Sequence, residues 1–457
     1  MARFGLMTFA ALTKYSGHPR NALALDILAR TGSSAATSIF VVRYLGPTRS
    51  GILVLATTIA AIGVPFAAAG TNEILFQRFA SGLNSIAKPA QLSPGFEPSA
   101  TAQGDEWLRP AWEIRVRASV LAFLFCSVLG AVFANDLGTI VLSSLSLAAV
   151  PFDLSTVRLI AHRNLGIAIR GRIAVIALIA ILKLAAVALR LPLQTFAALT
   201  SLEIVGLALA SHRSQRSGFS GLGSRNPLSR DPRSHLKRCA LRRSSLPFLV
   251  VTILNLAILR IDVLLVKARL GAMQVGRYGA IVRIAELALL PFAVVVPLAL
   301  TSFRMQTDPG SSEFGSKSRF LFLRVATMAV IPSLAVALFG PQLIKTLYGE
   351  EFAVGTTNAV RMLAIAVPFV VCVTLRDSYF ALIQRENLVV WGPFLGLLAN
   401  VGLNLFLLRK VGLIGASIAS VAGYAIALFA PLILLYFSHR GPQPRQTRQA
   451  KGKIHAE

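Results

Sequence analysis

Residues 23–70, LALDILARTGSSAATSIFVVRYLGPTRSGILVLATTIAAIGVPFAAAG, contain two apolar runs with Gly46 and Gly51 at the junction between them. Each run, 23–44 and 50–70, is long enough to cross about 30 Å of hydrocarbon at about 1.5 Å per residue of α-helix. The intervening segment has room only for a tight turn, which glycine favours. The stretch therefore predicts a helical hairpin that spans a membrane.

Ten further apolar runs of similar length follow, so we expect about twelve transmembrane helices. The composition agrees, because 55% of the residues are hydrophobic and only 14% are charged, with a mean hydropathy of +0.67. A soluble core does not need that much apolar surface. The fold class predicted is an all-α polytopic membrane protein. The further runs lie near 116–134, 137–157, 166–190, 193–211, 246–266, 279–300, 321–340, 359–382, 388–408 and 413–437.

The net charge of +27 could suggest a nucleic-acid partner, but the basic residues lie in short segments between the apolar runs. Counted in and beside those segments, 31 Lys and Arg fall on the side of the two termini and 9 on the opposite side. This asymmetry is the positive-inside signal of membrane orientation. We expect a multi-pass protein of the bacterial cytoplasmic (inner) membrane, with both termini cytoplasmic and no nucleic-acid partner.

A basic segment divides the twelve runs into two sets of six. The expected organisation is two six-helix lobes, joined by a basic cytoplasmic linker and flanked by two cytoplasmic ends. The boundaries are 1–22 for the N-terminal segment, 23–211 for the N-terminal lobe, 212–245 for the linker, 246–437 for the C-terminal lobe and 438–457 for the basic tail. A second cytoplasmic segment, 71–113, is rich in proline and is expected to be irregular.

The two sets of six also resemble each other. The pattern L-G-x4-G occurs at Leu45-Gly46 with Gly51, and again at Leu270-Gly271 with Gly276, 225 residues later. The element P-F-A follows in both halves, at Pro65 and at Pro291, displaced by one further residue. We interpret the match as an internal repeat, which is typical of transporters.

At these residues the chain resembles the polysaccharide flippase family of the multidrug/oligosaccharidyl-lipid/polysaccharide exporter superfamily. The resemblance covers most of the chain and is weak between 80 and 240. The motifs that carry it are Val41-Val42-Arg43-Tyr44-Leu45-Gly46-Pro47 through Gly51; Ile261-Asp262-Val263-Leu264-Leu265-Val266 followed by Leu270-Gly271, Val275-Gly276-Arg277-Tyr278 and Arg283-Ile284-Ala285-Glu286-Leu287; Leu347-Tyr348-Gly349-Glu350-Glu351-Phe352; and Val411-Gly412-Leu413-Ile414-Gly415-Ala416-Ser417-Ile418-Ala419.

The resemblance implies a flippase that moves polyprenyl-diphosphate-linked oligosaccharide across the membrane by cation-coupled alternating access between the two lobes. It implies membrane lipids, a polymerase and other polysaccharide assembly proteins as partners. From the residues themselves, no Ser/His/Asp set, paired catalytic carboxylates, nucleotide-phosphate loop or metal-ligand cluster is visible. We therefore expect no catalytic residue, no cofactor and no metal.

A diphosphate is costly to bring into hydrocarbon, so basic residues within the runs are candidate substrate ligands. Arg260 and Arg283 are the strongest candidates, and Lys183, Arg30 and Lys267 complete the set. Local ion pairs remain alternatives for two of them, because Lys183 lies at a depth similar to that of Glu203, and Arg283 stands three residues before Glu286.

Acidic residues within the runs are candidates for coupling transport to a cation gradient. They are Asp262, Asp153, Asp26 and Glu286. Asp26 could instead pair with Arg30 at i, i+4, and Asp153 could be protonated and inert. Three arginines close to the ends of runs are expected to extend their side chains to the interface. They are Arg361, Arg376 and Arg409.

Three other functions share parts of this pattern. A lipid II flippase is the nearest, although such proteins usually have two more helices. A multidrug/cation antiporter of the same superfamily should have an acidic or aromatic cavity, whereas cations are prominent here. A membrane polysaccharide polymerase needs a sizeable loop on the outer side, and none exceeds about 20 residues on these boundaries.

The charge asymmetry makes the topology testable. Cysteines placed at Ser224 and Gln446 are expected to stay unlabelled when an impermeant reagent is added to intact cells, because both positions fall on the basic side. They should react once the membrane is permeabilised. Labelling of either position from outside would contradict the twelve-helix topology.

Overall fold

The computed structural model describes residues 19–72, 74–75, 107–133, 136–161, 165–218, 234–306, 314–382 and 386–440. Helices account for nearly all of this part of the chain, which contains no strand. The helices are α2 (Pro19–Ala68), α5 (Leu108–Phe133), α6 (Leu137–Ser144), the 3-10 helix η2 (Leu145–Ala149), α7 (Leu154–Ala161), α8 (Leu165–Ala188), α9 (Leu193–Gly218), α10 (Ser234–Leu270), α11 (Ala272–Gln306), α12 (Phe314–Tyr348), α13 (Glu350–Ala353), α14 (Thr357–Ala364), α15 (Ala366–Leu382), α16 (Glu386–Val411) and α17 (Leu413–Arg440).

The predicted twelve crossings are present. Within the described residues, nine helices are long and apolar enough to cross a membrane, and the longest of them, Leu25–Ala68, holds two crossings. Its backbone leaves the helical region at Gly46, with φ 70° and ψ 174°, at the predicted hairpin turn. A bent pair, Leu137–Ala149 and Leu154–Ile160, forms an eleventh crossing with a 49° break. The 35-residue helix α11 is long enough to be the twelfth.

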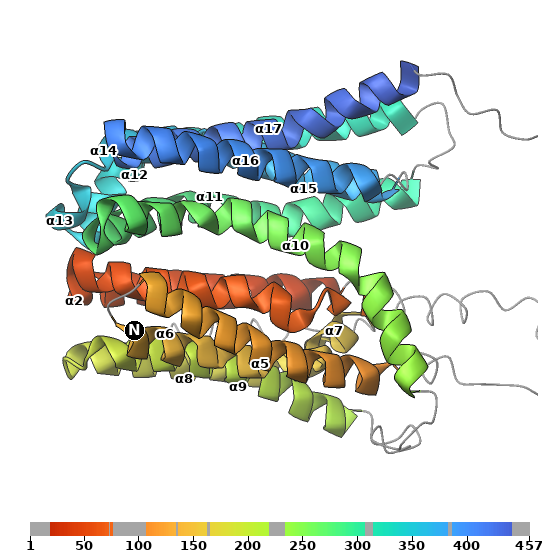
Figure 1. The fold of residues 1–457 in the computed structure, drawn as a ribbon, viewed down its shortest axis with the longest axis horizontal. Helices are drawn as coiled ribbons and strands as arrows, with labels where there is room; N and C mark the ends of the chain where they lie inside the picture. Colours follow the sequence, from red (N-terminus) through yellow and green to blue (C-terminus); the bar gives the residue numbers. More distant parts are fainter. Residues whose placement is uncertain are drawn as a thin grey trace, which may run out of the picture.

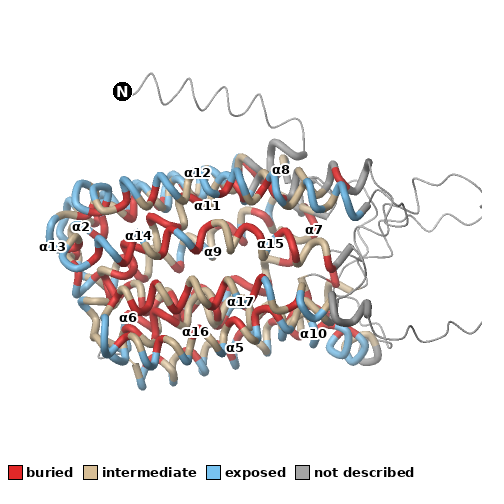
Figure 2. The backbone as a smooth tube through the Cα atoms, turned by 90° about the horizontal axis from the view of Figure 1, so that it is seen from above, coloured by how far each residue is buried: buried red, intermediate tan, exposed pale blue. Residues whose placement is uncertain are grey.

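The crossings lie side by side in two lobes along the long axis of the molecule (Figure 1). The first lobe contains α2 to α9, and the second contains α10 to α17. Large apolar side chains cover much of the outer surface, and Val132 is 73% exposed. Figure 2 shows buried backbone along the inner faces of the helices and exposed backbone around the periphery. An apolar periphery suits a lipid environment, where such exposure carries no hydrophobic cost.

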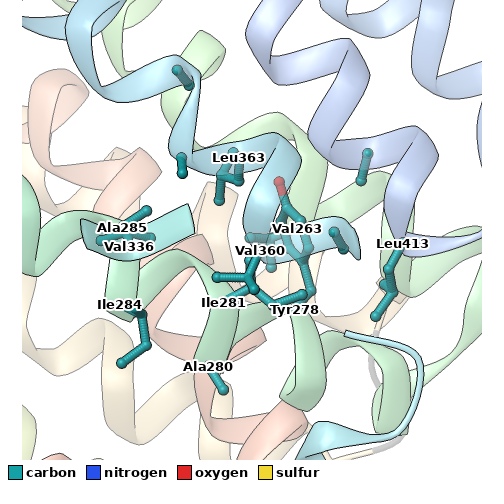
Figure 3. Close-up of a cluster of buried hydrophobic side chains, with 14 of the residues drawn as sticks. Val263, Tyr278, Ala280, Ile281, Ile284, Ala285, Val336, Val360, Leu363 and Leu413 are labelled. Atoms are coloured by element: carbon teal, nitrogen blue, oxygen red, sulfur yellow. The ribbon is translucent and has the colours of Figure 1, made fainter. Parts of the chain in front are cut away.

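The second lobe has the larger apolar core. Val360 and Leu363 of α14 lie beside Tyr278 and Ile281 of α11 in this core (Figure 3). The first lobe has separate clusters, of which one joins α2, α5 and α6 and also includes Leu264 of α10. This contribution from α10 makes part of the interface between the lobes apolar.

The repeat glycines meet at the interface between the lobes. A Cβ atom on Gly51 of α2 would lie 1.9 Å from the Ala272 carbonyl oxygen, and one on Gly276 of α11 would lie 1.9 Å from the Pro47 carbonyl oxygen. These two contacts are related by the same 225-residue shift, so they are reciprocal, as in a two-fold interface. Gly46 and Gly271, which precede the two carbonyl residues, both have positive φ. We call this end of the molecule the glycine end and the opposite one the linker end.

Two boundaries differ from those expected. Helix α9 continues to Gly218 and α10 begins at Ser234, so both ends of the predicted linker 212–245 are helical. Apolar residues explain the extension of α10, because Leu241 is buried against Ile74 and Ala111 of the first lobe. The proline-rich segment 71–113 lies mostly outside the described residues, and its last part is the start of α5 rather than irregular.

The close approach of the repeat glycines predicts a steric effect. Gly51→Ala or Gly276→Ala should lower the unfolding free energy by about 1–3 kcal/mol, because the new methyl group cannot fit against a carbonyl oxygen without moving the helices apart. The measurement is the thermal unfolding of the purified protein. Gly32→Ala on the same helix is the matched control, since a Cβ there would have no neighbour within 4 Å. Equal unfolding temperatures for Gly51→Ala and Gly32→Ala would contradict the contact.

Candidate functional site

A cavity of about 220 Å³ lies between the lobes, where α2 faces α10, α11 and α12. Three of the charged residues singled out from the sequence line it: Arg260, Arg283 and Glu286. The wall from α2 is rich in hydroxyl groups, and the remaining wall is mostly apolar. The lining residues are Thr31, Ser34, Ala35, Ser38, Ile39, Val54, Thr57, Thr58, Ala61, Arg260, Val263, Gly279, Val282, Arg283, Glu286, Leu287 and Tyr348.

Arg260 is only partly satisfied by its neighbours. Its Nη2 atom lies 3.2 Å from Oε1 of Glu286, across the α10–α11 contact. Its Nε atom is buried without a hydrogen-bond partner in the structure. A buried unsatisfied donor costs about 1–3 kcal/mol, more when charged, so an anionic group that reached this nitrogen would recover that cost.

Arg283 has no partner of its own in the part of the chain described here. The alternative pair with Glu286 three residues along the helix is not formed, because that carboxylate pairs with Arg260 from the neighbouring helix. Arg283 is half-buried and lines the cavity. Two guanidinium groups and one carboxylate therefore leave the cavity with an excess of positive charge.

The hydroxyl groups of α2 fall into two sets. The Thr57 and Ser38 side chains donate to backbone carbonyls of their own helix. The Thr31, Ser34 and Thr58 hydroxyls form no hydrogen bond with a described residue and remain free to bind a ligand. Across the cavity, basic side chains of the second lobe therefore face hydroxyl groups of the first lobe.

Lys183 belongs to a pair away from the cavity. Its Nζ atom donates to Oε2 of Glu203 over 2.6 Å, and both side chains are nearly buried. The pair joins α8 to α9 within the first lobe. The local ion pair considered from the sequence is therefore confirmed, and Lys183 does not line the cavity.

Asp26 pairs with Arg172 rather than with Arg30. Arg172 donates from Nε and Nη2 to the two carboxylate oxygens of Asp26, at 2.7 and 2.8 Å, and from Nη1 to the Ser211 hydroxyl at 2.9 Å. A bidentate guanidinium–carboxylate contact is stronger than a contact along one helix. Arg30 is exposed and does not line the cavity. The i, i+4 pair expected in the first run is wrong, because α8 packs against α2 at this level.

Asp262 lies in the core of the second lobe, outside the cavity. It accepts hydrogen bonds from the Tyr278 hydroxyl at 2.5 Å and the Ser420 hydroxyl at 3.3 Å. Two fully buried asparagines, Asn400 and Asn404, lie on α16, which packs against α10, and each retains an amide atom without a partner. Neither the hydroxyl partners of Asp262 nor the two buried asparagines were found from the sequence, because Asn and Ser do not stand out in an apolar run.

The two remaining candidates are also outside the cavity. Lys267 is in the last turn of α10, partly exposed. Asp153 lies in the break between η2 and α7, where its backbone N–H donates to the Ala149 carbonyl. No group of three His, Cys, Asp or Glu residues in the described ranges could hold a metal ion.

Two fully buried arginines were not anticipated. Arg376 was expected to reach the interface, but it is 0% exposed, pairs with Asp377 and donates to the Leu428 carbonyl. Gly392 makes room for its guanidinium, since a Cβ there would lie 2.7 Å from Nη2. Arg115 donates to Thr71, Asn72 and the Val150 carbonyl. The adjacent Asp377 was the available sequence signal for Arg376, whereas Arg115 looked like an ordinary basic residue at the end of a run.

Solved structures with this architecture are transporters. No protein-family model and no curated protein matches the sequence. The chain is similar to an inward-facing multidrug resistance MATE family transporter of the MOP superfamily, with 13% identity over 91% of this chain and 98% of that chain and a TM-score of 0.65. The chain has the MOP superfamily fold.

Two further structures show the range of that superfamily. The lipid II flippase MurJ, in an inward closed conformation, is 13% identical over 88% of this chain and 87% of that chain, with a TM-score of 0.55. A MOP superfamily transporter from Pyrococcus furiosus, for which reverse polarity of the binding pocket suggests a different function, is 14% identical over 93% and 97%, with a TM-score of 0.56. The MOP fold therefore occurs in proteins with different cargoes.

The Asp26–Arg172 contact predicts a double-mutant effect. Asp26→Ala should lower the unfolding free energy by about 3–5 kcal/mol, because Arg172 then remains as an uncompensated buried charge. Adding Arg172→Leu should restore most of that loss, since the charge is removed as well. Thermal unfolding of the purified single and double variants measures the difference. A double variant as unstable as Asp26→Ala would contradict this account.

Proposed function

We propose that the protein is a flippase that moves polyprenyl-diphosphate-linked oligosaccharide across the cytoplasmic membrane for polysaccharide biosynthesis. The observation that carries the proposal is the cavity between the lobes, where Arg260 offers an unpartnered Nε atom and Arg283 an unpaired guanidinium. One guanidinium group can donate two parallel hydrogen bonds to two oxygens of a phosphate. Two guanidinium groups therefore suit the two phosphates of a diphosphate. The hydroxyl groups on α2 suit the sugar hydroxyls of the same cargo.

The charge of the cavity distinguishes this cargo from a cationic drug. The single acid in its lining, Glu286, is already paired with Arg260. A cationic drug would meet an excess of positive charge at a site of low dielectric, where repulsion is strong. A lipid II flippase remains a closely related second candidate, because lipid II also joins a diphosphate to a lipid and a saccharide.

For the coupling cation, we propose Asp262 as the acid that binds it. Asp26 is occupied by Arg172 and Glu286 by Arg260, so neither carboxylate is available without breaking an ion pair. Asp262 instead accepts hydrogen bonds from neutral hydroxyl groups. Replacing these neutral donors with a proton or a small cation costs less free energy than replacing a guanidinium partner.

The substrate proposal predicts the effect of removing either arginine. Arg260→Ala and Arg283→Ala should each lower flipping of a diphosphate-linked oligosaccharide by about tenfold or more, because a charge-assisted hydrogen bond contributes roughly 1.5–3 kcal/mol. Arg→Lys at the same positions should lower flipping less, because the charge remains and only the bidentate geometry is lost. The measurement is flipping in reconstituted vesicles.

The control is Arg319→Ala, an exposed arginine of α12 that is not part of the cavity. It should leave flipping unchanged, and all variants should be compared at equal membrane abundance. Wild-type flipping by both cavity variants would contradict the diphosphate site. Faster export of a cationic dye by either variant than by the wild-type protein would favour a multidrug role.

A further inference from the structure

The first turns of α10 cross from the second lobe to the first at the linker end (Figure 1). Arg238 donates from Nη1 to Oε2 of Glu113 on α5 over 2.5 Å. Leu241 is fully buried in a cluster of first-lobe residues. A Cβ atom on Gly70 would lie 2.4 Å from the Ser245 carbonyl oxygen, so α10 also touches the end of α2. This part of α10 therefore connects the two lobes.

Basic residues gather where α10 meets the start of α5. We call the first turns of α5 and α10 the α5–α10 patch, and their basic residues are Arg109, Arg117, Lys237, Arg238, Arg242 and Arg243. Its acid, Glu113, already accepts from Arg109 at 3.1 Å and from Arg238 at 2.5 Å. Arg242 and Arg243 are exposed and bond to no residue that the structure describes. Arg242 and Arg243 therefore receive no negative charge from an acid in the described part of the chain.

The depth of the patch indicates what supplies that charge. On α10 the exposed apolar surface begins one turn after the two arginines, with Leu246 at 59% and Val250 at 41% exposure. On α5 it begins one turn after Arg117, with Leu121 at 67% exposure. Trp112, 40% exposed, belongs to a residue type that favours the membrane interface. A soluble anion would contact only the basic residues, whereas a phospholipid also contacts the adjoining apolar surface.

We propose that the α5–α10 patch binds anionic phospholipid headgroups, with the lipid phosphate at Arg242 and Arg243 and the acyl chains along Leu246 and Val250. Because these turns of α10 are docked on α5 through Arg238, the lipid binds the segment that joins the two lobes. It favours the arrangement in which α10 stays docked on α5. The lipid thereby regulates the lobes from outside the cavity, whatever cargo the cavity carries.

Cys239 provides a native probe of this site. It is exposed and stands one turn before Arg242 and Arg243, whereas Cys126 and Cys372 are buried. The full-length protein is placed in nanodiscs of phosphatidylcholine, or of phosphatidylcholine mixed with phosphatidylglycerol, and treated with an uncharged maleimide. We expect labelling of Cys239 to be about tenfold slower with phosphatidylglycerol, because lipid bound at the neighbouring Arg242 and Arg243 covers the thiol.

The variant Arg242→Gln/Arg243→Gln should lose this protection. Its control, Arg319→Gln/Arg324→Gln, removes two exposed arginines from the linker end of α12, outside the patch, and should keep it. Both variants must elute as the wild-type protein does in size exclusion. Equal labelling in the two lipids, or protection that persists in Arg242→Gln/Arg243→Gln, would overturn the proposal. Equal protection by inorganic phosphate in phosphatidylcholine nanodiscs would also overturn it, because the site would then bind phosphate without a lipid.

Discussion

A charged side chain at the depth of the hydrocarbon is costly unless a polar partner or a cavity receives it. This constraint sorts the charges within the crossings into two groups. Asp26 with Arg172 and Lys183 with Glu203 are closed pairs that hold neighbouring helices of the first lobe together. Arg260, Arg283 and Glu286 instead face the space between the lobes, where the one acid pairs with Arg260. The second group is the one that can exchange its partners for a ligand.

The glycine contact determines where that space can lie. Gly51 and Gly276 bring the backbones of α2 and α11 together at the glycine end, closer than any side chain would permit. The same two helices line the cavity further along, where Thr57 and Gly279 face it. The sequence repeat thus has a direct structural meaning, because each copy supplies both the glycine and the carbonyl residue that receives the other copy's glycine.

The sequence predicted the helices well because each crossing carries its own signal, namely a run of apolar residues of sufficient length. It also identified Arg260, Arg283 and Glu286 as unusual. It could not determine partners, because a partner depends on which helices adjoin. The partner that the sequence offered Asp26 was Arg30 on its own helix, whereas the structure pairs it with Arg172, 146 residues away. The prediction that Arg376 reaches the interface was wrong for a related reason, because the space for its guanidinium is created by Gly392 on another helix.

Helix α10 links the cavity to the linker end. Its first turns contact α5 through Arg238. Further along the helix, Arg260 lines the cavity and Asp262 lies in the core of the second lobe. About 13 residues separate Pro247 from Arg260, or roughly 20 Å of helix. A proline inside a helix removes one backbone hydrogen bond and permits bending at that point. Because Pro247 lies between the docked turns and the cavity arginine, the two ends of α10 can change their relative direction there while the helix on each side stays intact. The first turns can therefore stay on α5 while the segment that carries Arg260 changes its direction.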